Sequence, residues 1–318
     1  MKKVLFIAES HFGLYKIFEK GMQNAGFEVT TIPIQYEEFK EYKNLKQRVH
    51  NFFAKKFLKK NLKDYFRSEG LIASVSKKSR FDYVFIICPE LLHPDHLKFL
   101  KTICDKMIVY YWDGFDHFPK YIDTVPYFDK CYTFDPVDAK KYNLNLVTNF
   151  YFAENRNTKP ETDFFFLSSY DNRYPLVEKI VSLLEKQNQK ILVYQYIRNP
   201  ETTATPENKS IQFINNYISI EDAARHTQQS RIVLDIHKTI QQGLSFRVFE
   251  AMGLEKKLIT TNPDIVNYDF YNPNNIFIWR EDTESIPTDF LNTAYQQVPD
   301  EIYKKYSRES WIEKVFDL

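Results

Sequence analysis

The chain has 318 residues, of which 43 are Lys or Arg and 42 are Asp or Glu, giving a formal net charge of +1. This length suits two domains of about 150 residues each. The near-neutral charge disfavours a general nucleic-acid-binding protein, and no run of about 18 apolar residues is present that would span a membrane.

Cysteine and glycine usage narrows the class of protein further. The three cysteines are odd in number and lack metal-ligand spacing, so we expect reduced thiols in a cytoplasmic protein. Only seven glycines occur, and neither a Gly-x-Gly-x-x-Gly motif nor a Walker loop is present. We therefore expect no nicotinamide cofactor, and we expect phosphate to be held by side chains and helix ends.

The first half of the chain predicts a parallel sheet covered by helices. The apolar run at 3–8 is too short for a signal peptide and ends at Glu9, so it predicts a first strand. Helical spacing at 14–25 continues a β-α-β series. Further strands are predicted at 27–34, 81–88, 106–112, 130–134 and 144–150.

Within this half, the segment 40–67 is unusually basic. It holds ten Lys or Arg residues against two acidic ones, with aromatic residues interleaved. We predict an amphipathic helix that either rests on an anionic membrane surface or packs on the sheet with a solvated basic face. Nucleic-acid binding by this segment is disfavoured because the whole chain is nearly neutral.

The strand-and-helix pattern restarts after a polar stretch at 153–163, which we interpret as an interdomain linker. A helix is predicted at 175–186 and an amphipathic helix at 301–318. Strands are predicted at 164–167, 190–196, 210–214, 232–236 and 257–261. The chain is therefore predicted to be an α/β protein of two domains.

A polar loop leading into a short helix carries the most specific chemical signal. Gln242, Gly243 and Ser245 precede a helix start, whose N–H groups and positive dipole end suit a phosphate. Arg247 can bind a phosphate through two parallel hydrogen bonds. Glu250, on the same helix face, can accept hydrogen bonds from a sugar diol. The alternative is a surface ion pair between Arg247 and Glu250.

This segment resembles the donor-binding motif of GT-B glycosyltransferases, in which a Glu before Ala-Met holds the nucleotide ribose. In this chain that residue is Glu250, followed by Ala251 and Met252. The family pattern often has a second Glu eight positions earlier that contacts the transferred sugar, and Gln242 stands there instead. The resemblance is clearest over roughly residues 230–270.

The resemblance implies two Rossmann-like domains that face each other across a cleft. Residues 1–153 would form the acceptor domain and 163–300 the nucleotide-sugar donor domain, while the helix at 301–318 would cross back to the first domain. The implied activity is metal-independent transfer of a sugar from a nucleotide sugar to a cell-surface glycan or lipid-linked acceptor, as in capsule and lipopolysaccharide transferases. The protein would act in the cytoplasm, at the inner face of the plasma membrane. The nucleotide base, the sugar and the stereochemical course stay open.

Polar residues after two predicted strands of the second domain are further donor-site candidates. Ser169 and Arg173 follow the first of these strands, and His237 and Lys238 follow the strand at 232–236. Ligands of such sheets bind at the carboxyl ends of the strands. An ordinary capped loop and a structural histidine are the alternatives.

The acceptor proton requires a general base, and loops after the strands of the first domain offer candidates. Glu9 and His11 follow the first strand, whereas Asp113 and Asp116 follow a later one, and Asp113 is preferred. A simple turn at Asp113 and Gly114 is the alternative. This loop lacks the Asp-x-Asp metal signature of the other main glycosyltransferase fold, so no metal site is expected.

Two other functions fit the same pattern. A nucleotide-sugar epimerase of this architecture would act on its substrate without an acceptor. A non-catalytic scaffold of a glycan-assembly complex is favoured by Gln242, because the Glu expected at that position is missing.

Overall fold

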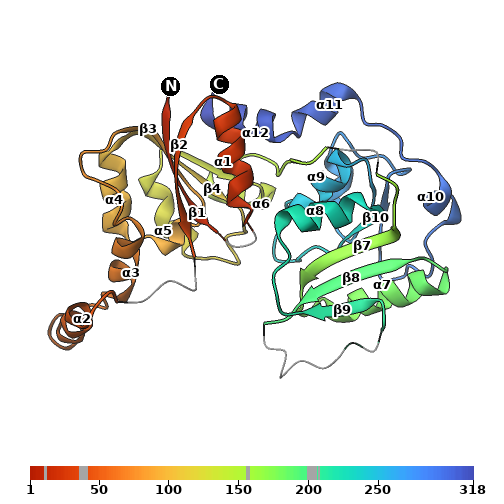
Figure 1. Ribbon diagram of the computed structural model, residues 1–318, viewed down its shortest axis with the longest axis horizontal. Coiled ribbons are helices and arrows are strands. Elements are labelled where there is room, and N and C mark those ends of the chain that lie inside the picture. The colour runs from red at the N-terminus through yellow and green to blue at the C-terminus, as the bar shows by residue number, and fades with distance from the viewer. Residues whose placement is uncertain (11–12, 36–41, 155–157, 199–205, 207) are drawn as a thin grey trace. The chain divides into compact units, whose positions relative to one another are not determined.

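The computed structural model describes residues 1–10, 13–35, 42–154, 158–198, 206 and 208–318. They form two compact units, shown in Figure 1. Unit 1 comprises Met1–Val147 together with Val315–Leu318, and unit 2 comprises Thr148–Lys314. Within the described ranges, no helix has the length and hydropathy needed to cross a membrane.

Unit 1 is built on a six-stranded parallel sheet in the order β2-β1-β3-β4-β5-β6. The strands are β1 (Lys3–Glu9), β2 (Glu28–Ile34), β3 (Phe81–Ile86), β4 (Cys104–Tyr111), β5 (Lys130–Thr133) and β6 (Asn145–Leu146). The α-helices are α1 (Tyr15–Asn24), α2 (Leu45–Leu58), α3 (Lys63–Leu71), α4 (Pro94–Thr102), α5 (Tyr121–Thr124) and α6 (Pro136–Tyr142). The central strands are mostly buried, as their nearly continuous apolar sequences require in a sheet covered on both faces.

Unit 2 repeats this plan with a second six-stranded parallel sheet, ordered β12-β11-β10-β7-β8-β9. The strands are β7 (Thr162–Ser169), β8 (Ile191–Tyr196), β9 (Ile211–Ile214), β10 (Ser230–Asp235), β11 (Lys257–Thr260) and β12 (Ile276–Ile278). The α-helices are α7 (Tyr174–Lys186), α8 (Ile220–Gln228), α9 (Phe246–Gly253), α10 (Thr288–Asn292) and α11 (Asp300–Lys305), followed by α12 (Arg308–Phe316), which runs into the last residues of unit 1.

Successive residues of β10 show how the sheet of unit 2 is covered on both faces. Ile232 and Leu234 belong to one core cluster, which also contains Ile180 of α7. Val233 points to the other face, into a cluster that contains Val248 of α9. This alternation, which follows from the two-residue period of a strand, anchors α9 against the sheet.

The predicted α/β class, with two Rossmann-like domains, is confirmed, and the structure corrects several details. The strand expected at 144–150 shortens to β6, and β12 was not predicted. The helix expected within 40–67 is divided into α2 and α3, because Lys59 takes a left-handed φ of 53° at the end of α2. Residues 40 and 41 of that segment lie outside the described ranges.

The C-terminal segment 301–318 is also two helices and not one. Between α11 and α12, the N–H of Tyr151 donates to the carbonyl of Tyr306 at 3.0 Å, and the N–H of Arg308 donates to the carbonyl of Tyr151 at 3.0 Å. These bonds form a short parallel bridge at Ser307 that interrupts the helix. Unit 2 begins at Thr148, before the linker expected at 153–163. Asn149 is already bound to unit 2, because its side chain donates to the carbonyl of Leu244 at 2.9 Å.

Candidate functional site

The strand order of unit 2 defines where a ligand is expected to bind. Counted from its first strand, the sheet has the order 3-2-1-4-5-6, which is the doubly wound arrangement of dinucleotide-binding folds. The order reverses between β7 and β10, and ligands of such sheets bind outside the carboxyl ends of the strands at this switch point. A ligand is therefore expected beside the residues that follow β7 and β10.

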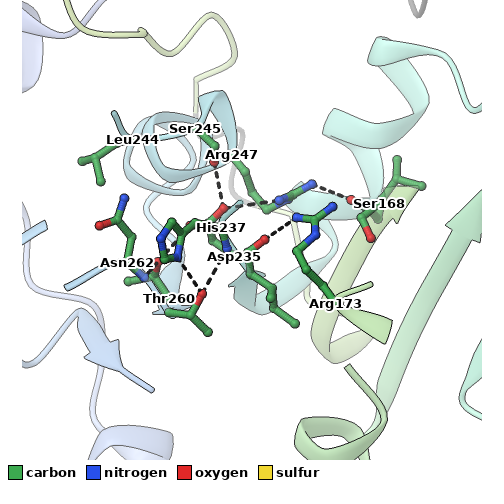
Figure 2. A network of polar contacts seen from close by, with 12 residues as sticks. Ser168, Arg173, Asp235, His237, Leu244, Ser245, Arg247, Thr260 and Asn262 are labelled. Atoms are coloured by element: carbon green, nitrogen blue, oxygen red, sulfur yellow. Dashed lines mark hydrogen bonds and ion pairs between the residues drawn. The ribbon is translucent and has the colours of Figure 1, made fainter. Parts of the chain in front are cut away.

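Asp235 organises this edge of the sheet. It ends β10, is 1% exposed, and accepts hydrogen bonds from Ser245 Oγ and Thr260 Oγ1, each at 2.8 Å. Nη1 of Arg247 lies 3.3 Å from the same carboxylate (Figure 2). Ser245 occupies the N-cap position of α9, but its hydroxyl bonds to Asp235 and does not cap the helix. The buried carboxylate thus ties the start of α9 to the ends of β10 and β11.

Two arginines span the switch point, as Figure 2 shows. Arg247 donates from Nη2 to the carbonyl of Leu167 in β7, and its guanidinium lies 5.1 Å from the centre of the Phe166 ring. Arg173 pairs with Asp171 at 2.7 Å and donates from Nη1 to the carbonyl of Ile236, just after β10. Arg173, which follows β7, therefore bonds to the residue after β10. Arg247 pairs with the last residue of β10 and also bonds to β7.

The electrostatics of Arg247 follow from its position. Burial lowers its pKa, and the charge of Asp235 acts in the opposite direction. Its side chain is 26% exposed, so a ligand can reach part of this residue. A partly desolvated guanidinium fixed by protein partners is pre-organised to bind an anion.

Glu250 lies one helical turn beyond Arg247. Burial raises its pKa to about 7, and the positive charge of Arg247 acts in the opposite direction. In the described ranges, its carboxylate forms neither a hydrogen bond nor an ion pair, while Arg247 pairs with Asp235. The alternative of a surface ion pair between Arg247 and Glu250 is therefore wrong, and the carboxylate keeps its acceptor capacity for a ligand.

The remaining donor-site candidates fall into two groups. His237 is held in place, because its backbone N–H and Nδ1 lie 3.0 and 3.1 Å from Thr261 Oγ1, and burial lowers its pKa. The carbonyl of Gln242 accepts from Asn262 Nδ2 at 3.2 Å, which ties the loop before Gly243 to the residues after β11. Ser169, by contrast, is exposed, and Lys238 is half-buried beside the end of β10.

Sequence reasoning missed part of this network. Asp235, Thr260 and Asn262 were not among the predicted site residues. Thr260 Oγ1 bonds to Asp235, and Asn262 bonds to the loop before α9. Thr260 ends β11 and Asn262 directly follows the strand predicted at 257–261, so their position at a strand end was the available signal.

The corresponding edge of unit 1 carries carboxylates. Its strand order reverses between β1 and β3, and Glu9 ends β1. Burial, and to a smaller extent the charge of Asp113, raise the pKa of Glu9 to about 7. A hydrogen bond from Cys88 Sγ to the Glu9 carboxylate, at 3.8 Å, lowers this pKa in part. Burial raises the pKa of Glu90 to about 8, and its Oε2 is buried with no hydrogen-bond partner in the described chain. Cys88 and Glu90, which follow β3, were not predicted.

The other candidates of unit 1 are less defined. Asp113 is half-buried after β4 and close enough to influence the pKa of Glu9. Asp116 is exposed, 3.8 Å from Lys141 Nζ. His11 lies outside the described residues. In the ranges that the structure describes, no group of three or more His, Cys, Asp or Glu side chains is arranged to hold a metal ion.

Comparisons with known proteins agree with this architecture. The sequence matches neither a protein-family profile nor a curated protein. Among solved structures, a glycosyltransferase from Rickettsia africae ESF-5 is 11% identical with a TM-score of 0.54, covering 99% of this chain and 97% of that one. A UDP-GlcNAc 2-epimerase from Methanocaldococcus jannaschii is 13% identical with a TM-score of 0.52, covering 99% and 100%. At such identities the likeness is one of fold, and the chain has the two-domain GT-B architecture.

Proposed function

We propose that this protein is a glycosyltransferase that moves a sugar from a nucleotide-sugar donor to an acceptor hydroxyl. The observation that carries the proposal is the switch point of unit 2, where Arg173 and Arg247 are fixed by protein partners and where the Glu250 carboxylate, one helical turn beyond Arg247, has no partner in the described chain. A nucleoside diphosphate offers the anion and the ribose diol that these groups bind.

In this proposal the diphosphate binds at the start of α9. Arg247, the N–H groups of the helix and Arg173 supply the positive electrostatic field, and Lys238 adds charge at the end of β10. Glu250 accepts hydrogen bonds from the ribose hydroxyls. Gln242, Gly243, Ser245, Ser169 and His237 shape the loops around the donor. Because the cationic charge comes from arginines, we propose that transfer does not depend on a metal.

The chemical step requires a base for the acceptor. The acceptor oxygen forms a bond to the anomeric carbon, the bond from that carbon to the diphosphate oxygen breaks, and the diphosphate leaves with the electron pair. A pKa of about 7 suits Glu9 to take the acceptor proton near neutral pH. Asp113 contributes by raising that pKa, and His11 remains a second candidate base.

The acceptor is proposed from the resemblance of the loop and helix around Glu250 to capsule and lipopolysaccharide transferases. That resemblance supports a glycan or lipid-linked acceptor at the inner face of the plasma membrane. An epimerase is the second candidate, because Glu9 and Glu90 both have raised pKa values suited to proton transfer. An epimerase would convert a nucleotide sugar with no acceptor present, whereas a transferase would not.

A thermal-shift panel with UDP, GDP, ADP, dTDP and CMP tests the donor site. Ligand at 100 times its dissociation constant stabilises the folded protein by about 2.7 kcal/mol, a shift of a few degrees. We expect a selective shift in the wild type that is lost in Glu250→Ala. The matched control is Glu221→Ala, which removes an exposed carboxylate from α8 of the same unit. A flat panel would favour the non-catalytic scaffold, whereas equal shifts in both variants would place the nucleotide site away from Glu250.

A further inference from the structure

Helix α2 packs on unit 1 through a polar side, at the edge of the unit beside α3 (Figure 1). Asn51 is 2% exposed, and its Oδ1 accepts from the N–H of Leu62 at 2.7 Å. Gln47 Nε2 donates to Glu69 Oε2 of α3 at 3.0 Å. With Ala54, these residues form the side of α2 that the protein covers.

The opposite side of α2 carries exposed apolar side chains, and Lys46 and Lys56 project from the same side. At about 100° per residue, Leu45, Val49, Phe52, Phe53 and Phe57 fall on one arc of the helix that faces away from Asn51. We call these five residues the apolar face. Their exposed fractions range from 45% to 73%. The rings pack on one another, with centroid distances of 5.6 Å for Phe52–Phe53 and 6.0 Å for Phe53–Phe57.

This exposure is unusual within the molecule. In the described ranges, Phe52, Phe53 and Phe57 are the phenylalanines among the exposed large hydrophobic residues. Contiguous exposed apolar surface of this kind marks an interaction site.

The charge around the apolar face identifies the kind of partner. Residues 45–60 contain no Asp or Glu, and all of their basic side chains are exposed. These are Lys46, Arg48, Lys55, Lys56, Lys59 and Lys60. Since the whole chain has a net charge of only +1, this excess is local. The partner must therefore combine an apolar interior with negative charge at its surface.

The geometry points to an anionic lipid bilayer, in whose surface α2 lies with the apolar face inserted and the basic residues at the headgroups. A second copy of this chain fits less well, because it would bring two basic surfaces together without counter-charge. Nucleic acid offers phosphates, but it offers no apolar layer for Leu45 and Val49. This inference rests on α2 alone and does not depend on sugar transfer.

Vesicle flotation tests the inference directly. We expect the protein to float with vesicles that contain about 30% phosphatidylglycerol in phosphatidylcholine, and to float much less with phosphatidylcholine alone or at high salt. The triple variant Phe52→Ser/Phe53→Ser/Phe57→Ser should reduce the bound fraction about tenfold. Its matched control, Ile122→Ser/Val137→Ser, removes exposed hydrophobic residues elsewhere in unit 1 and should bind as the wild type does.

A charge variant tests the second half of the inference. Lys55→Glu/Lys56→Glu should weaken flotation severalfold, whereas Lys140→Glu/Lys141→Glu, a lysine pair in the last turn of α6, should not. The inference is overturned if the wild type stays unbound to anionic vesicles at low salt, or if the triple variant binds equally well. A dimer in light scattering that the triple variant abolishes, or an oligonucleotide complex, without flotation would assign α2 to those partners instead. If nucleotide still raises the melting temperature of the triple variant, its donor site is intact and its loss of flotation comes from α2 alone.

Discussion

The two sheets of this protein share an architecture, but their carboxyl edges carry opposite chemistry. In unit 2 the edge holds two arginines, and its buried carboxylate, Asp235, receives three side-chain donors. In unit 1 the edge holds Glu9 and Glu90, whose pKa values are raised by burial, and Oε2 of Glu90 receives no donor in the described chain.

The difference shows that residues after the strands, and not the strand order, set the chemistry of each edge. A buried carboxylate surrounded by donors holds neighbouring groups in position, as Asp235 holds Ser245 and Arg247. A buried carboxylate without donors instead retains its proton to higher pH. One edge is therefore suited to bind an anion and the other to exchange a proton.

The largest effect is expected when the central carboxylate of unit 2 is removed. Asp235→Ala leaves the Arg247 charge and the Thr260 hydroxyl without this buried partner, so unit 2 should lose about 3–5 kcal/mol of stability. Asp222→Ala is the matched control: Asp222 also pairs with an Arg and a Ser, but its side chain is 46% exposed. Urea unfolding measures the free energy of unfolding of both variants and of the wild type. A loss in Asp235→Ala as small as that in the control would contradict this role.

Removal of one cation from the same edge should weaken nucleotide binding. Arg173→Ala is expected to lower the affinity for the preferred nucleoside diphosphate by about 10- to 100-fold, since a charge-assisted contact is lost. Isothermal titration calorimetry measures this change in affinity. Arg225→Ala, which breaks an exposed ion pair in α8, should leave the affinity unchanged. If the affinity of Arg173→Ala were unchanged, Arg173 would stabilise its loop but would not bind the nucleotide.

The buried carboxyl of Glu90 in unit 1 should make stability depend on pH. The pKa of Glu90 is raised to about 8 by burial, so the folded state binds this proton more tightly than the unfolded state, and stability falls as pH rises from about 4.5 to 8. Glu90→Gln should therefore be more stable than the wild type by a few kcal/mol at pH 9 and equal to it at pH 4, since each pKa unit corresponds to about 1.4 kcal/mol.

Chemical unfolding at both pH values checks this prediction. Glu28→Gln, an exposed glutamate at the start of β2, serves as the control. A difference between wild type and Glu90→Gln that is the same at both pH values would argue against titration of Glu90.

The smallest effect expected is the pH dependence of nucleotide affinity. Burial raises the pKa of Glu250 to about 7, and a ribose diol favours the ionised carboxylate. Affinity should therefore rise up to about fivefold between pH 6 and pH 8. In Glu250→Gln that rise should disappear, leaving only the titration of the phosphate itself. Parallel pH profiles in the two proteins would exclude this linkage.

Local sequence predicted the sheets well and the sites only in part. Long apolar runs such as Val4–Ala8 specify buried parallel strands, whereas the three residues of β12 are too few to give a pattern. The partners of Asp235 lie 10 to 25 residues away, so its network depends on the assembled sheet. The burial of Glu90, which follows β3, likewise depends on tertiary packing, and neighbouring residues in the sequence do not reveal it.

Hydrogen–deuterium exchange with and without the preferred nucleotide tests most directly whether the donor binds at the switch point of unit 2. Donor binding at this switch point predicts slower exchange, on nucleotide addition, in peptides that cover residues 167–174 and 235–250. Peptides of unit 2 that cover α10 and α11 should exchange at the same rate in both conditions. Unchanged exchange at 167–174 and 235–250, with protection elsewhere, would contradict it.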